Sequence, residues 1–226
     1  MTAGAARKPR PGVAPDREAR QAQPPLAGPR LVRLHLASRR VPAALAAVAA
    51  CAVVLRVALH WHWDTYGALQ LPLVFEAGAA AVIAVATASP LGEPERATGR
   101  WLPYLRLGAA LALTAAAAGA LAAAGTGAHL AGGTLDVLRN VAGLTGIGLL
   151  CAAVLGGGLA WAGPLGYMVI GLYALYTDWH GPALTTPWIW PARPPHDLGA
   201  VLCAGLVFAA GMAVITVRGA RDCAGE

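Results

Sequence analysis

The sequence has little charge and almost no lysine. Only 12% of its 226 residues are charged, whereas a soluble domain usually carries about 25%. This shortage argues against a soluble globular domain. Lys8 is the sole lysine, and the residues around it do not form the phosphate-binding pattern G-x-x-x-x-G-K-[ST]. The chain therefore has no Walker-type ATPase of its own.

Motifs for hydrolysis and metal binding are also missing. The sequence has no G-x-S-x-G, no H-E-x-x-H and no EF-hand pattern. Its 4 cysteines lack C-x-x-C spacing, and most of them lie in apolar runs, where cysteine acts as a small hydrophobic residue. We expect no catalytic site, no metal and no cofactor in this chain, and we do not expect it to be an enzyme.

Long apolar runs are what the chain does have. Residues of the hydrophobic class make up 57% of it, and each of six runs approaches the roughly 20 residues that cross a bilayer as a helix. The sequence predicts an all-α, polytopic membrane protein with six transmembrane helices preceded by a basic interfacial helix. The expected spans are 41–60, 69–89, 103–124, 137–160, 163–178 and 198–217.

The flanks of the membrane domain, 41–217, differ in character. Residues 1–29 are rich in Pro, Ala and Arg without apolar periodicity, which predicts a disordered tail. Residues 30–40, RLVRLHLASRR, alternate leucine with arginine. They fit either an amphipathic helix in the headgroup layer or a basic flank of the first span. Residues 218–226 form a short second tail.

Basic residues gather on one side of the spans. Nine lie between Arg7 and Arg40, and others lie in the 90–102 loop and the C-terminal tail. By the positive-inside rule we expect a plasma-membrane protein with both termini in the cytoplasm. A net charge of +6 placed beside spans favours contact with anionic lipid, and we expect no nucleic-acid partner.

Charged residues inside spans are the first candidate site. Arg56 near the outer end of the first span and Glu76 in the second lie at similar expected depth. Because an unpaired charge in a bilayer is costly, we expect the two to pair. The pair is either a gate or substrate contact, or a salt bridge that holds two helices together.

Polar residues open the fourth span on the outer side. Asp136 is positioned to cap the helix, and Arg139 either pairs with it or lines an outer vestibule. The candidate vestibule residues are Asp136, Arg139 and Asn140. Further along, Gly143, Gly146 and a third glycine, Gly148, give this span a small-residue face suited to close helix packing, within one chain or between chains.

Two connections complete the layout. The 90–102 loop carries Glu93, Glu95, Arg96 and Arg100, and is either a docking loop for a soluble partner or a solvated connector. The outer segment 178–197 is rich in Pro and Trp and is expected to dip back into the membrane interface.

This layout resembles the permease subunits of ABC-2-type transporters. The matching stretches are RLVRLHLASRR, PLGEPERATGRW and DWHGPALTTPWIWPARPP, and the stretch LRNVAGLTGIGLLCAAVLGGGLAWAGPLGY looks like small permease-like membrane proteins of actinobacteria. The resemblance implies an exporter of an amphipathic or hydrophobic compound, energised by a separate ATP-binding subunit. It also implies a homodimer or a sister permease, with the 90–102 loop coupling ATP hydrolysis to the spans.

Two other classes remain open on the sequence. One is a membrane interaction or immunity protein without transport activity. The other is a membrane enzyme that modifies lipid, for which only His60, His62 and Asp64 offer clustered polar groups at one face.

Overall fold

The fold is a bundle of long helices. The computed structural model describes residues 41–61, 65–88, 102–127, 130, 132–177 and 186–218, and no strand occurs among them. Six helices are long and apolar enough to cross a membrane, which confirms the predicted all-α, six-span class. They are α2 (Val41–Ala58), α3 (Thr65–Thr87), α5 (Leu102–Ala124), α6 (Gly133–Leu155), α7 (Ala162–Tyr176) and α8 (Leu198–Arg218).

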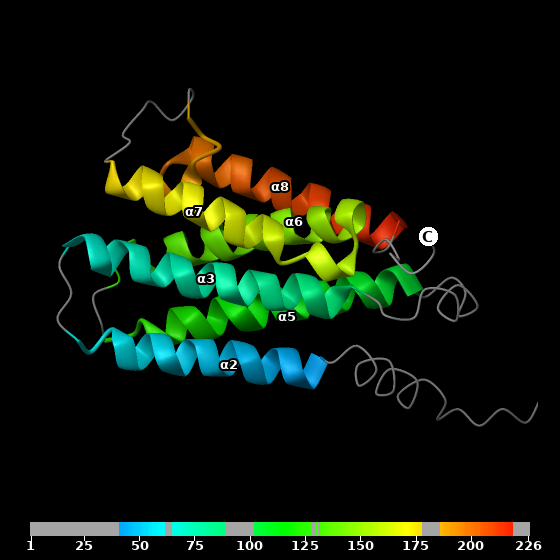
Figure 1. Ribbon diagram of the computed structural model, residues 1–226, viewed down its shortest axis with the longest axis horizontal. Coiled ribbons are helices and arrows are strands. Elements are labelled where there is room, and N and C mark those ends of the chain that lie inside the picture. The colour runs from blue at the N-terminus through cyan, green and yellow to red at the C-terminus, as the bar shows by residue number, and fades with distance from the viewer. Residues whose placement is uncertain are drawn as a thin grey trace, which may run out of the picture. The chain divides into compact units, whose positions relative to one another are not determined.

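Consecutive helices run in opposite directions, so the bundle has two distinct ends. Figure 1 shows the end of α2, the end of α7 and the beginning of α8 at its left, and the beginning of α2 and the end of α8 at its right. We call the left-hand end the Arg193 end and the right-hand end the Arg218 end. The first span therefore begins at the same end of the bundle at which the last span finishes, as an even number of spans requires.

Helices α3 and α6 form the centre of the bundle. Helix α3 packs against α2, α5, α6 and α7, and α6 packs against α3, α5, α7 and, most extensively, α8. Within an apolar stretch of 18 residues in α6, 61% of the residues are buried, compared with 22% in α2. The helices around this central pair therefore have broad faces free for lipid.

Small residues allow α6 and α8 to pack closely. A Cβ added to Gly146 would lie 2.6 Å from the backbone of Phe208, and one added to Gly211 would lie 2.6 Å from the carbonyl oxygen of Gly146. Such distances are too short for any side chain, so the two backbones meet only because both positions are glycine. The glycine face predicted for the fourth span thus packs within the chain.

Helix α6 begins and ends earlier than the sequence predicted. It begins at Gly133 and ends at Leu155. The end is set by Gly156, whose φ of 89° breaks the helix and is a conformation that glycine adopts readily. A short 3₁₀ turn, η3 (Gly157–Leu159), then leads into α7. Helix α7 has 15 residues and, together with η3, gives an apolar segment of 20 residues, which is enough to cross a membrane.

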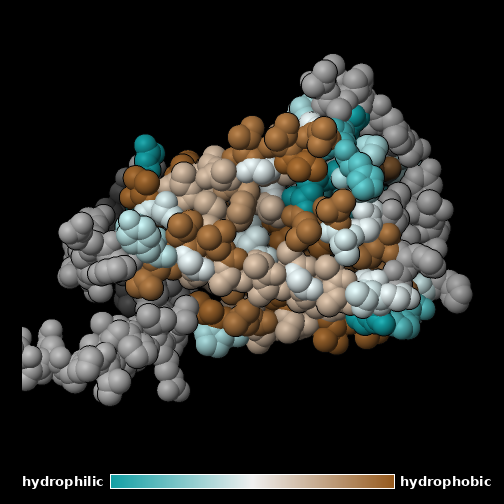
Figure 2. All heavy atoms as spheres, turned by 180° about the vertical axis from the view of Figure 1, so that it is seen from behind, coloured by the Kyte–Doolittle hydropathy of each residue, from teal (hydrophilic) through white to brown (hydrophobic). Residues whose placement is uncertain are grey.

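The surface of the helices is mainly apolar. Figure 2 shows brown and tan side chains over most of the face in view, with the largest group of teal side chains toward its right, which is the Arg193 end. Large exposed apolar residues occur on every span, among them Val53, Tyr104, Val154, Val169 and Leu206. This distribution is that of a bundle whose outer surface faces lipid.

Candidate functional site

Glu76 on α3 is an ionisable side chain buried inside the bundle. It is 1% exposed, and its Oε2 atom accepts a hydrogen bond of 3.0 Å from the amide nitrogen Nδ2 of Asn140 on α6. Asn140 is itself 3% exposed, and its amide oxygen has no hydrogen-bond partner among the described residues. The central helices are thus joined by a polar contact inside the apolar bundle.

Arg139, one residue earlier on α6, is also buried. Its side chain is 1% exposed and forms an ion pair with Asp136. It also donates hydrogen bonds to the carbonyl oxygens of Pro194, at 2.9 Å, and Arg193, at 3.2 Å. Arg139 therefore ties α6 to the segment that precedes α8.

Asp136 does not cap α6, contrary to the sequence interpretation. The helix begins at Gly133, so Asp136 lies in its first turn, and the N-cap residue Gly132 makes no side-chain capping bond. Its carboxylate pairs instead with Arg139, which was the other role considered for that arginine. The side chain is placed by the arginine beside it on the same helix face.

Arg56 also differs from the prediction, because its partner is not Glu76. Its guanidinium donates hydrogen bonds to the carbonyl oxygens of Ala124, at 3.1 Å, and Thr126, at the end of α5. Among the described residues no ion pair joins Arg56 to Glu76, which accepts a hydrogen bond from Asn140 instead. The expected Arg56–Glu76 pair is replaced because the last carbonyls of α5, which have no partner inside their own helix, attract the cation.

The described part of the connection before α8 is packed into the bundle. Ile189 and Trp190 are 1% and 2% exposed, and a short 3₁₀ turn, η4, spans Trp190–Ala192. The Trp190 ring stacks on Tyr167 of α7 at 4.5 Å between centroids, and it lies against α6 where Gly143 leaves room. Trp190 is therefore a core residue, whereas the sequence predicted only that its segment dips into the membrane interface.

An ion pair and a helix cap fix the end of that connection. Arg193 Nε donates to Asp197 Oδ2 at 2.7 Å, and the backbone N–H groups of Gly199 and Ala200 donate to Asp197 Oδ1. Burial raises the pKa of Asp197, but the hydrogen bonds from Arg193 and from these N–H groups outweigh it, so the pKa is lowered from its ordinary value. Asp197 thus anchors the start of α8 as a carboxylate.

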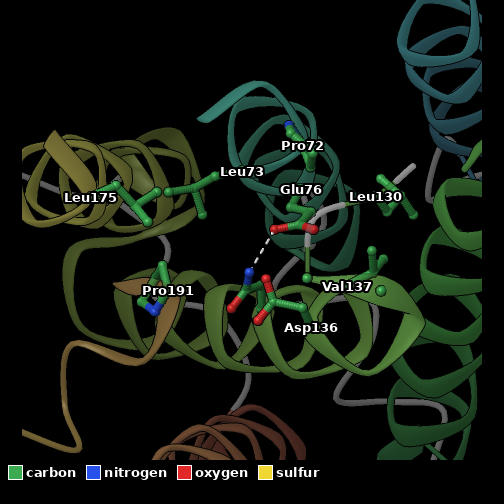
Figure 3. A pocket seen from close by; sticks show the side chains of 11 residues that line it. Pro72, Leu73, Glu76, Leu130, Asp136, Val137, Leu175 and Pro191 are labelled. Atoms are coloured by element: carbon green, nitrogen blue, oxygen red, sulfur yellow. Dashed lines mark hydrogen bonds between the residues drawn. The ribbon is translucent and has the colours of Figure 1, made fainter. Parts of the chain in front are cut away.

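A small pocket lies between α3 and α6 at the Arg193 end (Figure 3). Its volume is about 20 Å³, enough for one water-sized occupant. Figure 3 shows the carboxyl groups of Glu76 and Asp136 turned toward the same space, with Pro72, Leu73 and Leu130 around them. Asn140 also lines the pocket, whereas Arg139 does not. Of the polar residues predicted to open the fourth span, the structure brings Asp136 and Asn140 together with Glu76.

Several sequence predictions lie outside the described residues. These are the disordered tail 1–29, the interfacial helix 30–40, most of the C-terminal tail, and the coupling residues Glu93, Glu95, Arg96 and Arg100. His62 and Asp64 lie outside them as well. Within the described ranges no group of three or more His, Cys, Asp or Glu side chains is placed to hold a metal ion.

Sequence reasoning missed the Glu76–Asn140 contact and the anchoring role of Asp197. The first carries no local signal, because it depends on which helices become neighbours in the bundle. The second has one, since an aspartate directly before an apolar helix is a typical N-cap residue.

Comparison with known proteins gives no further assignment. No family model, no curated protein and no solved structure matches this chain. What the residues themselves establish is a multi-pass helical membrane protein with a buried polar cluster at one end.

Proposed function

We propose that this chain is the membrane permease subunit of an ABC-type exporter, energised by a separate ATP-binding subunit. It would work in the plasma membrane as a homodimer or beside a sister permease, with both termini in the cytoplasm. The Arg218 end then faces the cytoplasm, in keeping with the basic residues of the flanking segments. Its cargo is an amphipathic or hydrophobic compound.

The observation that carries the proposal is the polar cluster of Glu76, Asp136, Arg139 and Asn140 between the central helices. Ionisable side chains inside membrane segments are costly, and they typically mark substrate or ion pathways. A bundle that serves only as an anchor has no need of a buried carboxylate. The cluster therefore favours transport over a purely structural role.

The connection before α8 gives independent support. Its described part folds back onto the bundle, with Trp190 buried against α6 and α7 and Arg139 bonded to its backbone. A connection held in this way covers the Arg193 end of the cluster and supports the expectation that the outer segment dips back into the membrane. Opening it would expose the polar cluster to the outer side.

Co-purification tests the proposal. The tagged protein, extracted from its native membrane in mild detergent, should bring down an ATP-binding subunit in stoichiometric amount. Replacing both Glu93 and Glu95 by alanine should lower complex yield and permease-stimulated ATP hydrolysis about tenfold, equivalent to ~1.4 kcal/mol. His196→Ala, at the opposite end, is the matched control and should leave both unchanged.

Two results count against the exporter. Intact, folded protein that repeatedly purifies without an ATPase indicates a stand-alone interaction or immunity protein. An ATPase that binds but is unaffected by the Glu93 and Glu95 substitutions removes the coupling role of the 90–102 loop.

A further inference from the structure

The charge balance at Glu76 is incomplete. Arg139 is engaged by Asp136, and Arg56 is engaged by the carbonyls at the end of α5. The partner of Glu76 among the described residues is the neutral amide of Asn140. A buried carboxylate in a membrane segment without a cationic partner must either carry a proton or hold a cation.

The oxygen atoms around the pocket favour a cation. Two carboxylates, from Glu76 and Asp136, turn toward a space of about 20 Å³ (Figure 3). Asn140 lines the same pocket, is 3% exposed, and has an amide oxygen without a hydrogen-bond partner among the described residues. Hard cations bind carboxylate and amide oxygens, and the space admits one ion of about the size of a water molecule.

The charge count selects a monovalent ion. When a cation binds with both carboxyl groups ionised, Glu76 and Asp136 together with the Arg139 guanidinium leave one unit of negative charge for it to balance. Helix α7, which also packs on α3, has no charged residue, and α2, α5 and α8 each have one arginine. One positive charge therefore neutralises the site, whereas a divalent ion would leave an uncompensated charge in the bundle.

We propose that the pocket between α3 and α6 binds one small monovalent cation through Glu76, Asp136 and Asn140. The cation is an alkali ion or the ammonium group of an organic amine, since both present a single compact positive charge to the same oxygen atoms. The site needs no ATP-binding partner, so it can be tested on the isolated chain. The result of that test does not depend on whether the proposed exporter function is correct.

Thermal unfolding of the full-length protein in mild detergent tests the site. Chloride salts of sodium, potassium and methylammonium are compared with tetramethylammonium chloride, whose cation has no N–H group and is too large for the pocket, at constant ionic strength and pH. At concentrations above the dissociation constant, each tenfold rise in the concentration of the cation that binds should raise the melting temperature by about 3 to 5 °C. A response to methylammonium alone assigns the site to an amine group, and a response to sodium or potassium assigns it to an alkali ion.

Variants tie the response to the pocket. Glu76→Gln should abolish it, and Glu76→Asp, which keeps the charge on a shorter side chain, should shift the midpoint to about tenfold higher cation concentration. Asp197→Asn removes a carboxylate outside the pocket and should leave the response intact. Equal melting temperatures of the unmodified protein in all four salts would overturn the proposal, as would a full response in Glu76→Gln. The salt comparison on the unmodified protein decides the matter even if a variant fails to fold.

Discussion

The central helices α3 and α6 bury polar side chains, whereas the peripheral helices bury almost none. Of the six buried polar side chains among the described residues, five lie on α3 or α6: Glu76, Thr87, Arg139, Asn140 and Thr145. Helices α2 and α7 contribute none to that set, and only 22% of the residues in an 18-residue stretch of each span are buried. The peripheral helices therefore need only apolar side chains on the faces turned to lipid, whereas the polar side chains of the central helices need hydrogen-bond or ion-pair partners.

This difference indicates where substitutions matter. A lipid-facing position requires only an apolar side chain, because lipid adapts to its shape. A central position requires the right size, as at Gly146, or the right partner, as at Arg139. The substitutions below separate the two kinds of region, beginning with the largest expected effect.

Arg139→Met should have the largest effect. It removes the cation that pairs with Asp136 and the hydrogen bonds to the carbonyls of Arg193 and Pro194. Breaking a buried pair costs about 3–5 kcal/mol of unfolding free energy, measurable by thermal or denaturant unfolding in mild detergent. Arg218→Met, at the exposed end of α8, should change it by less than about 0.5 kcal/mol. Equal stability of the two variants would remove the distinction between centre and periphery.

Gly146→Ala should be the next most harmful. The new Cβ would lie 2.6 Å from the backbone of Phe208, so α6 and α8 must separate, at a cost of about 1–3 kcal/mol. The matched control is Gly205→Ala on α8, where nothing lies within 4 Å of the added atom. If the two variants unfold alike, close approach of α6 and α8 is not required.

Thr145→Val should be neutral or stabilising by about 1 kcal/mol. The Thr145 hydroxyl is buried and has no hydrogen-bond partner among the described residues, so its removal relieves an uncompensated desolvation cost. Thr114→Val on α5 removes a hydroxyl that donates to Ala110 at 2.7 Å and should destabilise by about 1 kcal/mol. Unfolding temperatures of both variants that move in the same direction would contradict this assignment of partners.

Asp197 should give the smallest effect, and one that depends on pH. Its lowered pKa means that the Asp197 carboxylate stabilises the fold above the unfolded-state value of about 3.9, and that this contribution is lost as the pH falls through the lower folded value. Because the group is partly open to solvent, we expect about 1 kcal/mol or less. Asp197→Asn should therefore unfold more easily than the unmodified protein at pH 7 and equally at the acid limit. A constant difference at both pH values would argue against an ionic role.

The sequence predicted the spans well because their signal is local. Run lengths and breaks located all six, and the errors are at ends such as Gly133 and Gly156, where backbone geometry decides. The partners of Glu76 and Arg56 were not predictable in the same way. Their similar expected depth in the membrane predicted that Glu76 and Arg56 pair with each other, but the neighbouring helices α6 and α5 supplied nearer partners. Which helix packs beside which is a property of the whole bundle.

Glu76 and Asn140 act as one unit that joins α3 to α6. A double-mutant cycle with Glu76→Leu and Asn140→Leu, each of which removes one partner of the hydrogen bond, is followed by thermal unfolding in mild detergent. We expect a coupling free energy of about 0.5–3 kcal/mol between the two positions, and additive effects when Glu76→Leu is combined with Asp197→Asn. Additive effects for Glu76 and Asn140 as well would contradict the claim.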